Sequence, residues 1–268
     1  MTRGQTVISR VWLTVLCLVP VAACGAPPAA PLVPSTAVVA ATPVVPSPPA
    51  PRVRTVVLDP GHNGGNASHP DEIGRQVPNG RGGTKACNTT GTSTAQGYDE
   101  HAFNWDVVLR VRDSLVERDV RVLLTRPDDI GVGPCVNERA AVANRAGADA
   151  MVSVHADGAA PSGQGFHVAY SDPPVHPSQG TPSTALARSL AGAMGDAGYP
   201  VSNYRGEDGL DTRDDLAGLN HAEVPAALVE CANMHNPDEA AQLSTAGGRA
   251  RYAAAITDGI LRWLATTP

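Results

Sequence analysis

From residue 52 to its end, the chain alternates short apolar runs rich in β-branched residues with longer segments whose apolar residues recur at helical spacing. The apolar runs predict strands over residues 55–58, 120–124, 150–154, 166–170 and 226–229. The longer segments predict helices over residues 102–118, 137–146, 183–197 and 248–264. Alternation of this kind is typical of a mostly parallel, twisted sheet with helices on both faces. We therefore expect one α/β domain over residues 53–268.

The residues before this domain have a different character. Arg3 and Arg10 supply positive charge, and the apolar run over residues 11–23 has the length of a secretory signal core but is too short for a stable membrane-spanning helix. Residues 24–52 are rich in proline, alanine and valine and contain no acidic residue and no lysine. Such a segment buries too little apolar surface to fold, and proline keeps it extended. We predict a signal peptide over residues 1–23 and a tether over residues 24–52.

The signal ends in Val-Ala-Ala-Cys-Gly at residues 21–25, which resembles a bacterial lipobox. The resemblance implies that Cys24 carries lipid and holds the protein on the outer face of the plasma membrane. Ordinary cleavage, which would give a secreted or periplasmic protein, is the alternative. The formal net charge of −6 argues against a nucleic-acid partner and against attraction to anionic lipid. Any membrane association should therefore come through the anchor. As a separate expectation, the protein should be a monomer.

Three cysteines lie in the expected domain. Cys87 and Cys135 both follow glycine-rich loop sequence, whereas Cys231 ends an apolar run. Export permits a disulfide. We therefore predict the pair Cys87–Cys135, which would stabilise the fold by about 4 kcal/mol through loop entropy. Three free thiols are the alternative.

Polar side chains gather where the predicted strands end. His62 lies just past the first strand, and His155 and Glu230 end two later strands, while Glu100 lies where a loop enters the first helix. Ligand sites in such folds form at the carboxyl ends of the strands. Two histidines and one carboxylate can hold a zinc ion with a position open for water, and a second carboxylate can move the proton of that water. The spacing alone also allows hydrogen-bonded polar residues with no metal.

Several short motifs surround these positions. They are Val-Val-Leu-Asp-Pro-Gly-His at residues 56–62, Glu100 with Asn104, Val-Leu-Leu-Thr-Arg-Pro at 122–127, Glu-Arg at 138–139 with Ala-Asn at 143–144, Val-Ser-Val-His-Ala-Asp at 152–157, and Pro-Ala-Ala-Leu-Val-Glu at 225–230. Together they resemble, in order, the motifs of the zinc-dependent N-acetylmuramoyl-L-alanine amidases of the amidase 3 family, and most closely its compact mycobacterial-type members. The similarity extends from residue 55 to about residue 243.

The resemblance implies that His62, Glu100 and His155 bind Zn²⁺ and that Glu230 is the general acid/base. The implied reaction is hydrolysis of the amide between N-acetylmuramic acid and L-alanine in peptidoglycan or a muropeptide. Asp157 departs from the family pattern, in which asparagine is common at this position. A non-catalytic peptidoglycan-binding lipoprotein and a zinc peptidase acting within the stem peptide are the alternatives.

Three further expectations concern the surroundings of this site. Regulated members of the family cover the zinc with an inserted helix, but residues 205–224 are polar and rich in glycine and aspartate, so we expect an open site. Arg139 should brace the fold. Asp59 should either orient a ligand histidine or cap the turn, and the sequence favours neither role.

Overall fold

The computed structural model describes residues 52–267. The predicted signal peptide, Cys24 and all of the predicted tether except its last residue lie outside this range. Among the described residues, no helix combines the length and the apolar character that crossing a membrane requires.

The described residues form short and long elements in alternation. In chain order these are β1 (Thr55–Pro60), η1 (Asn66–Ser68), α1 (Pro70–Gly74), β2 (Gln76–Pro78), β3 (Thr84–Ala86), α2 (Glu100–Val116), β4 (Arg121–Leu124), α3 (Val136–Ala146), β5 (Ala150–Asp157), β6 (His167–Ser171), η2 (Pro177–Gln179), α4 (Thr181–Asp196), β7 (Leu210–Arg213), α5 (Ala217–Asn220), β8 (Ala226–Asn233), α6 (Pro237–Leu243) and α7 (Ala246–Thr266). All nine predicted strands and helices are present.

The central sheet has six strands in the order β4-β1-β5-β8-β6-β7. Strands β4, β1, β5 and β8 are parallel to one another, whereas β6 pairs antiparallel with β8 and parallel with β7. The prediction of a mostly parallel sheet is therefore confirmed. The first strand is two residues longer than predicted, because Asp59 and Pro60 pair with Ser153 and Val154 of β5.

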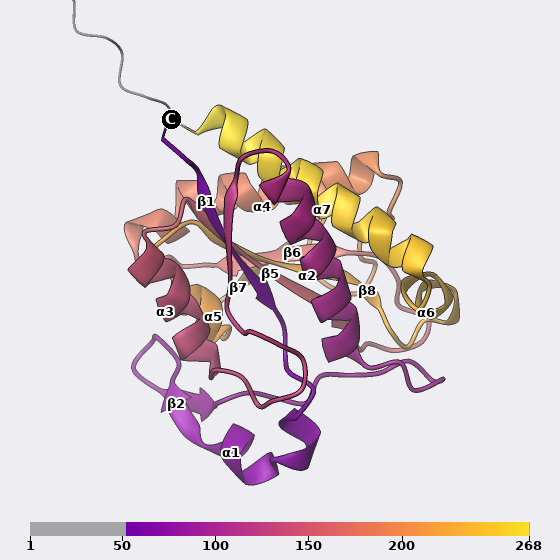
Figure 1. Ribbon diagram of the computed structural model, residues 1–268. Coiled ribbons are helices and arrows are strands. Elements are labelled where there is room, and N and C mark those ends of the chain that lie inside the picture. The colour runs from indigo at the N-terminus through magenta and orange to yellow at the C-terminus, as the bar shows by residue number, and fades with distance from the viewer. Residues whose placement is uncertain (1–51, 268) are drawn as a thin grey trace, which may run out of the picture. The chain divides into compact units, whose positions relative to one another are not determined.

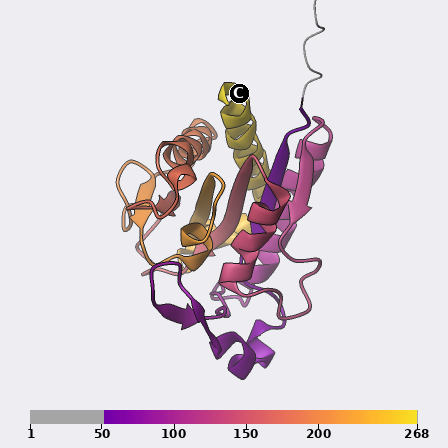
Figure 2. The same ribbon diagram turned by 90° about the vertical axis from the view of Figure 1, so that its left-hand side faces the viewer.

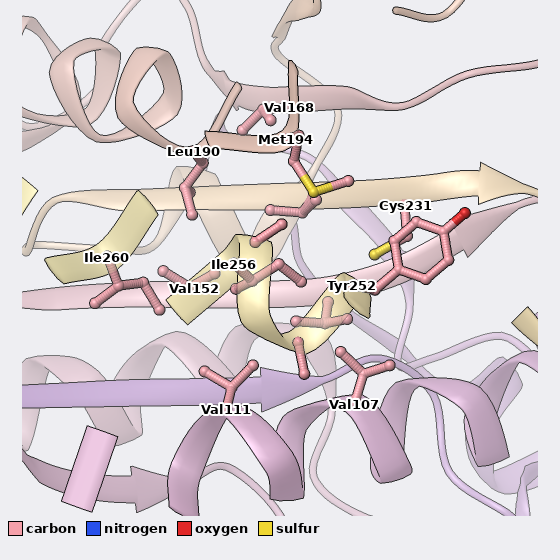
Figure 3. Packing of buried hydrophobic residues seen from close by; sticks show 14 of the residues in the cluster. Val107, Val111, Val152, Val168, Leu190, Met194, Cys231, Tyr252, Ile256 and Ile260 are labelled. Atoms are coloured by element: carbon pink, nitrogen blue, oxygen red, sulfur yellow. The ribbon is translucent and has the colours of Figure 1, made fainter. Parts of the chain in front are cut away.

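Helices cover both faces of this sheet (Figures 1 and 2). Helices α2, α4 and α7 pack together on one face, and α3 and α5 pack on the other. Figure 3 shows the larger core, in which side chains of α2, α4 and α7 meet Val152 of β5 and Val168 of β6. Each fully buried aliphatic side chain contributes about 1.5–3 kcal/mol, so this face supplies most of the apolar stabilisation.

A small hairpin of β2 and β3 lies beyond the carboxyl end of β1, below its arrowhead in Figure 1. Two connections hold the hairpin to the rest of the domain. Cys87 forms a disulfide with Cys135, the first residue before α3, as the sequence predicted. At the hairpin tip, Asn220 of α5 donates its Nδ2 to the carbonyl of Asn79 at 3.0 Å and accepts at Oδ1 from Arg81 Nε at 3.1 Å.

Candidate metal centre

His62, Glu100 and His155 come together at the carboxyl end of the parallel strands. One carboxylate oxygen of Glu100 lies 3.1 Å from His62 Nε2, and the other lies 2.9 Å from His155 Nδ1. One ligand atom from each of the three residues lies within 4.8 Å of the other two. Their positions come from three different elements: the loop after β1, the first residue of α2, and β5.

This donor set suits a zinc ion. Two imidazole nitrogens and one carboxylate oxygen are a common ligand set of catalytic zinc, which keeps a fourth position for water. Burial alone would raise the pKa of Glu100, but the nearby His62 and His155 outweigh that effect and hold it well below its usual range. The carboxylate is therefore ionised, as a metal ligand must be.

The backbone at His62 is in a left-handed conformation, with φ of 57°. A side chain rarely adopts this region without support from its surroundings. Arg139 supplies part of that support by donating to the carbonyl of His62 at 2.8 Å. His62 Nδ1 lies 3.0 Å from the carbonyl of Thr89, which can only accept, so Nδ1 carries the proton. That leaves the Nε2 lone pair facing the site.

Two glycines allow the ligands to pack closely. A Cβ atom at Gly61 would lie 2.2 Å from Cε1 of the His155 ring. At Gly91, where φ is 81°, a Cβ atom would lie 2.8 Å from the Glu100 carboxylate and 2.9 Å from the His62 ring. Both positions are thus closed to any larger residue while the ligands keep their places.

Asp59 acts on the site through Arg139. Its carboxylate accepts from Arg139 at 2.8 Å, from Thr125 Oγ1 at 2.5 Å and from Ser153 Oγ at 2.8 Å. Neither expected role of Asp59 describes this arrangement. The carboxylate of Asp59 accepts a hydrogen bond from Arg139, and Arg139 in turn donates to the backbone carbonyl of His62. Arg139 braces the fold, as expected.

The ion pair of Asp59 predicts a pH-dependent contribution to stability. Burial alone would raise the pKa of Asp59, but the charge of Arg139 and the hydrogen bonds from Thr125, Arg139 and Ser153 lower it overall. A lowered folded-state pKa stabilises the fold above the unfolded value of about 3.9, and this contribution is lost as the pH falls through the folded-state pKa. Asp59→Asn also leaves Arg139 buried without its counter-ion and should cost about 3 kcal/mol at neutral pH.

Urea unfolding of the wild type and of Asp59→Asn between pH 7 and pH 2 measures this contribution. The difference in free energy of unfolding should be largest near neutral pH and shrink below about pH 4. The exposed Asp71 offers a control, because Asp71→Asn should change little at any pH. A difference for Asp59→Asn that stays constant to pH 2 contradicts the assignment.

Glu230 of β8 stands beside the three ligands. It is the register partner of His155 on the parallel strand β5 and of His167 on the antiparallel strand β6, so these side chains point to the same face of the sheet. Its Oε2 atom is buried and has no hydrogen-bond partner within residues 52–267. Burial, together with the charges of Glu100 and Asp157, raises the pKa of Glu230 well above its usual range.

The ligands and Glu230 line one cavity of about 430 Å³. Its floor is the sheet end, with Asp59, Ser153 and Glu230. Residues of the hairpin and of the loop after it, including Lys85 and Asn88, also line the cavity, as do Leu216 to Leu219 at α5. Sequence reasoning did not identify Lys85 or these residues at α5 as parts of the site.

In the stretch before β8, residues 205–224, no acidic side chain belongs to the His62–Glu100–His155 group. Glu207 and Glu223 are both exposed, and within the described chain neither belongs to the His–Glu–His group. The expectation of an open site stays a prediction. The short helix α5, which lies in this stretch, lines the cavity.

His167 is the one other histidine placed next to Glu230. It is 1% exposed, and its ring packs edge-on against Tyr204 with centroids 6.0 Å apart. Burial lowers the pKa of His167 to about 4, so the ring is neutral at physiological pH.

Residues 56–262 match the family described as N-acetylmuramoyl-L-alanine amidase. The chain is 48% identical over 233 residues to the N-acetylmuramoyl-L-alanine amidase Rv3717 of Mycobacterium tuberculosis, a match that covers 85% of this chain and 95% of that protein.

Two solved structures of amidases also superpose on this chain. The amidase Ami1 of Mycobacterium smegmatis superposes with a TM-score of 0.78 at 48% identity, covering 80% of this chain and 98% of that one. The apo form of Ami1 from Mycobacterium abscessus superposes with a TM-score of 0.76 at 48% identity, covering 79% and 98%.

Proposed function

Since this chain belongs to the N-acetylmuramoyl-L-alanine amidase family, we propose that it hydrolyses the amide between N-acetylmuramic acid and L-alanine in peptidoglycan, using a zinc ion held by His62, Glu100 and His155. One observation carries the proposal beyond the family match. Three convergent ligand atoms and Glu230, whose buried Oε2 atom has no hydrogen-bond partner within residues 52–267, line the same cavity. That is the arrangement which metal-assisted amide hydrolysis requires.

Each group has a separate task in this reaction. When bound, the zinc ion supplies a Lewis acid that polarises the scissile carbonyl and lowers the pKa of the attacking water. Glu230 accepts the proton of that water on its carboxylate and delivers it to the departing amine of L-alanine. The Oε2 atom of Glu230 suits this double task, because no hydrogen bond from within residues 52–267 occupies it. Arg139 and Thr89 keep the His62 ring in place.

Product analysis tests the proposal. Purified protein is incubated with muropeptides, with and without a chelator, and the products are identified by mass spectrometry. An amidase releases intact stem peptides that begin with L-alanine, and the chelator should abolish their release. Shortened stems still attached to muramic acid would instead identify a zinc peptidase. Binding without any cleavage would identify a non-catalytic peptidoglycan-binding protein.

We also propose that the mature protein is a monomer anchored outside the plasma membrane through a lipid on Cys24. The support is the lipobox-like sequence at residues 21–25 and the proline-rich segment that follows it. Partition of the expressed full chain into a detergent phase tests the anchor. The wild type should enter the detergent phase and Cys24→Ser should not, whereas a wild-type protein found in the aqueous phase would favour free secretion.

A further inference from the structure

Lys85 holds an unusual place in the chain. Of the 20 lysine and arginine residues in the sequence, it is the single lysine. It lies in β3 and is one of the residues that line the cavity, together with His62, Glu100 and Glu230. The one flexible primary ammonium among the side chains of this protein thus lies at the reaction site.

The hairpin that carries Lys85 is fixed at both ends. The Cys87–Cys135 disulfide holds its base, and the hydrogen bonds of Asn220 with Asn79 and Arg81 hold its tip. The backbone of Lys85 pairs with Val77 in the middle of the two-stranded sheet. The backbone position of Lys85 at the cavity is therefore set by the fold and does not depend on a free loop, and its side chain extends from that fixed point.

The ammonium of Lys85 makes one hydrogen bond and no direct ion pair within residues 52–267. Its Nζ donates to the main-chain carbonyl of Asp215 at 2.8 Å, and within residues 52–267 no carboxylate lies within 4.0 Å of it. The carboxylate of Asp215 instead receives two hydrogen bonds from Arg213, both at 2.7 Å. An ammonium has three donors, so two remain available to a ligand. Burial lowers the pKa of Lys85, and the charge of Asp215 opposes this with a smaller effect. Water therefore solvates the ammonium only in part.

The other cation that lines the cavity is buried, and four of its five N–H donors are already used. Arg139 donates Nε to the carbonyl of Pro134 and its two terminal nitrogens to Asp59, Pro60 and His62. Its side chain is 4% exposed. A negatively charged ligand in the cavity can therefore reach Lys85 but not Arg139.

Resting on the proposed function, we propose that Lys85 binds a free carboxylate of the stem peptide and makes the enzyme selective for stems that carry it. The first carboxyl along a stem peptide belongs to the D-glutamate after L-alanine, which is linked onward through its side chain. Its α-carboxyl is either free or amidated. A free carboxylate forms a charge-assisted hydrogen bond with the ammonium, whereas a carboxamide brings no charge to it.

Two muramoyl tripeptides that differ only at this group test the inference. In one the second residue carries a free α-carboxylate and in the other a carboxamide. For the wild type, kcat/KM should be about tenfold higher on the carboxylate substrate, mainly through a lower KM. Lys85→Met should reduce this ratio to about 1, and Lys85→Arg should keep most of it. Arg75→Met is a matched control, since Arg75 is an exposed cation just before the hairpin and outside the cavity lining, and the ratio should stay at the wild-type value.

A second measurement needs no substitution. Expression with ¹³Cε-labelled lysine marks Lys85 alone and leaves its three N–H donors intact, because the chain has no other lysine. Adding the product peptide with a free α-carboxylate should shift the Lys85 resonance, and the amidated peptide should not. This readout stays decisive if Lys85→Met fails to fold.

The outcomes separate this inference from the proposed function. If the wild type releases no alanine-ended stem from either substrate, the proposed function fails. If it cleaves both substrates equally well, or if Lys85→Met keeps the wild-type ratio, the amidase stands and the role of Lys85 is overturned. An equal shift of the Lys85 resonance with both peptides also overturns it.

Discussion

Replacing Glu230 with glutamine is expected to lower kcat about a thousandfold and to leave the bound zinc unchanged. Glutamine has nearly the same shape but cannot accept a proton from water. Glu230 lies outside the three-residue ligand group, so its loss should not release the metal. The rate of muropeptide hydrolysis and the zinc content of the purified variant, measured by elemental mass spectrometry, give the two readouts.

A nearby carboxylate provides the control for this substitution. Glu223 is exposed on the loop before β8, and Glu223→Gln should keep both the rate and the zinc content of the wild type. If Glu230→Gln hydrolyses muropeptides at the wild-type rate, its role as general acid/base is wrong. Loss of zinc from Glu230→Gln would instead make this residue a ligand.

The second large effect is expected when a single methyl group is added at Gly61. Gly61→Ala should weaken zinc binding about 100-fold and abolish measurable hydrolysis at ordinary zinc concentrations. The added Cβ atom would lie 2.2–2.6 Å from three atoms of the His155 ring, so the ring must leave its place beside Glu100. Competition with a fluorescent zinc chelator measures the affinity.

A matched glycine elsewhere separates this effect from a general loss of stability. Gly192 lies inside α4, and a Cβ atom there would meet nothing within 4 Å. Gly192→Ala should therefore keep zinc affinity and raise the free energy of unfolding by up to about 1 kcal/mol. Wild-type zinc affinity in Gly61→Ala would show that the His155 ring can move aside without cost.

The main elements of the fold could be predicted because their apolar periodicity is strong. The run at residues 226–229 and the helix at residues 248–264 are plain in the sequence. Strand β7 was missed because Leu210–Arg213 follows a glycine- and aspartate-rich stretch and has a single apolar residue. The antiparallel direction of β6 was also not predicted, because periodicity shows that a strand exists but does not give its direction in the sheet.

The convergence of His62, Glu100, His155 and Glu230 was predictable in part. Strand ends indicated a common edge of the sheet, and the family resemblance selected these four residues. The supporting contacts were not predictable, because they join segments that are distant in sequence. Lys85 meets Asp215 across 130 residues, and the link from Asp59 through Arg139 to His62 depends on side-chain geometry.

The order of the strands in the sheet also bears on when this enzyme can act. Strand β8 is the last strand in the chain, yet it lies in the interior of the sheet between β5 and β6. A nascent or partly exported chain that ends before β8 therefore has a divided sheet and lacks Glu230. Activity can begin only after almost the whole polypeptide has emerged and this strand has inserted. A hydrolase of the cell wall built in this way cannot cut its substrate while it is still being made.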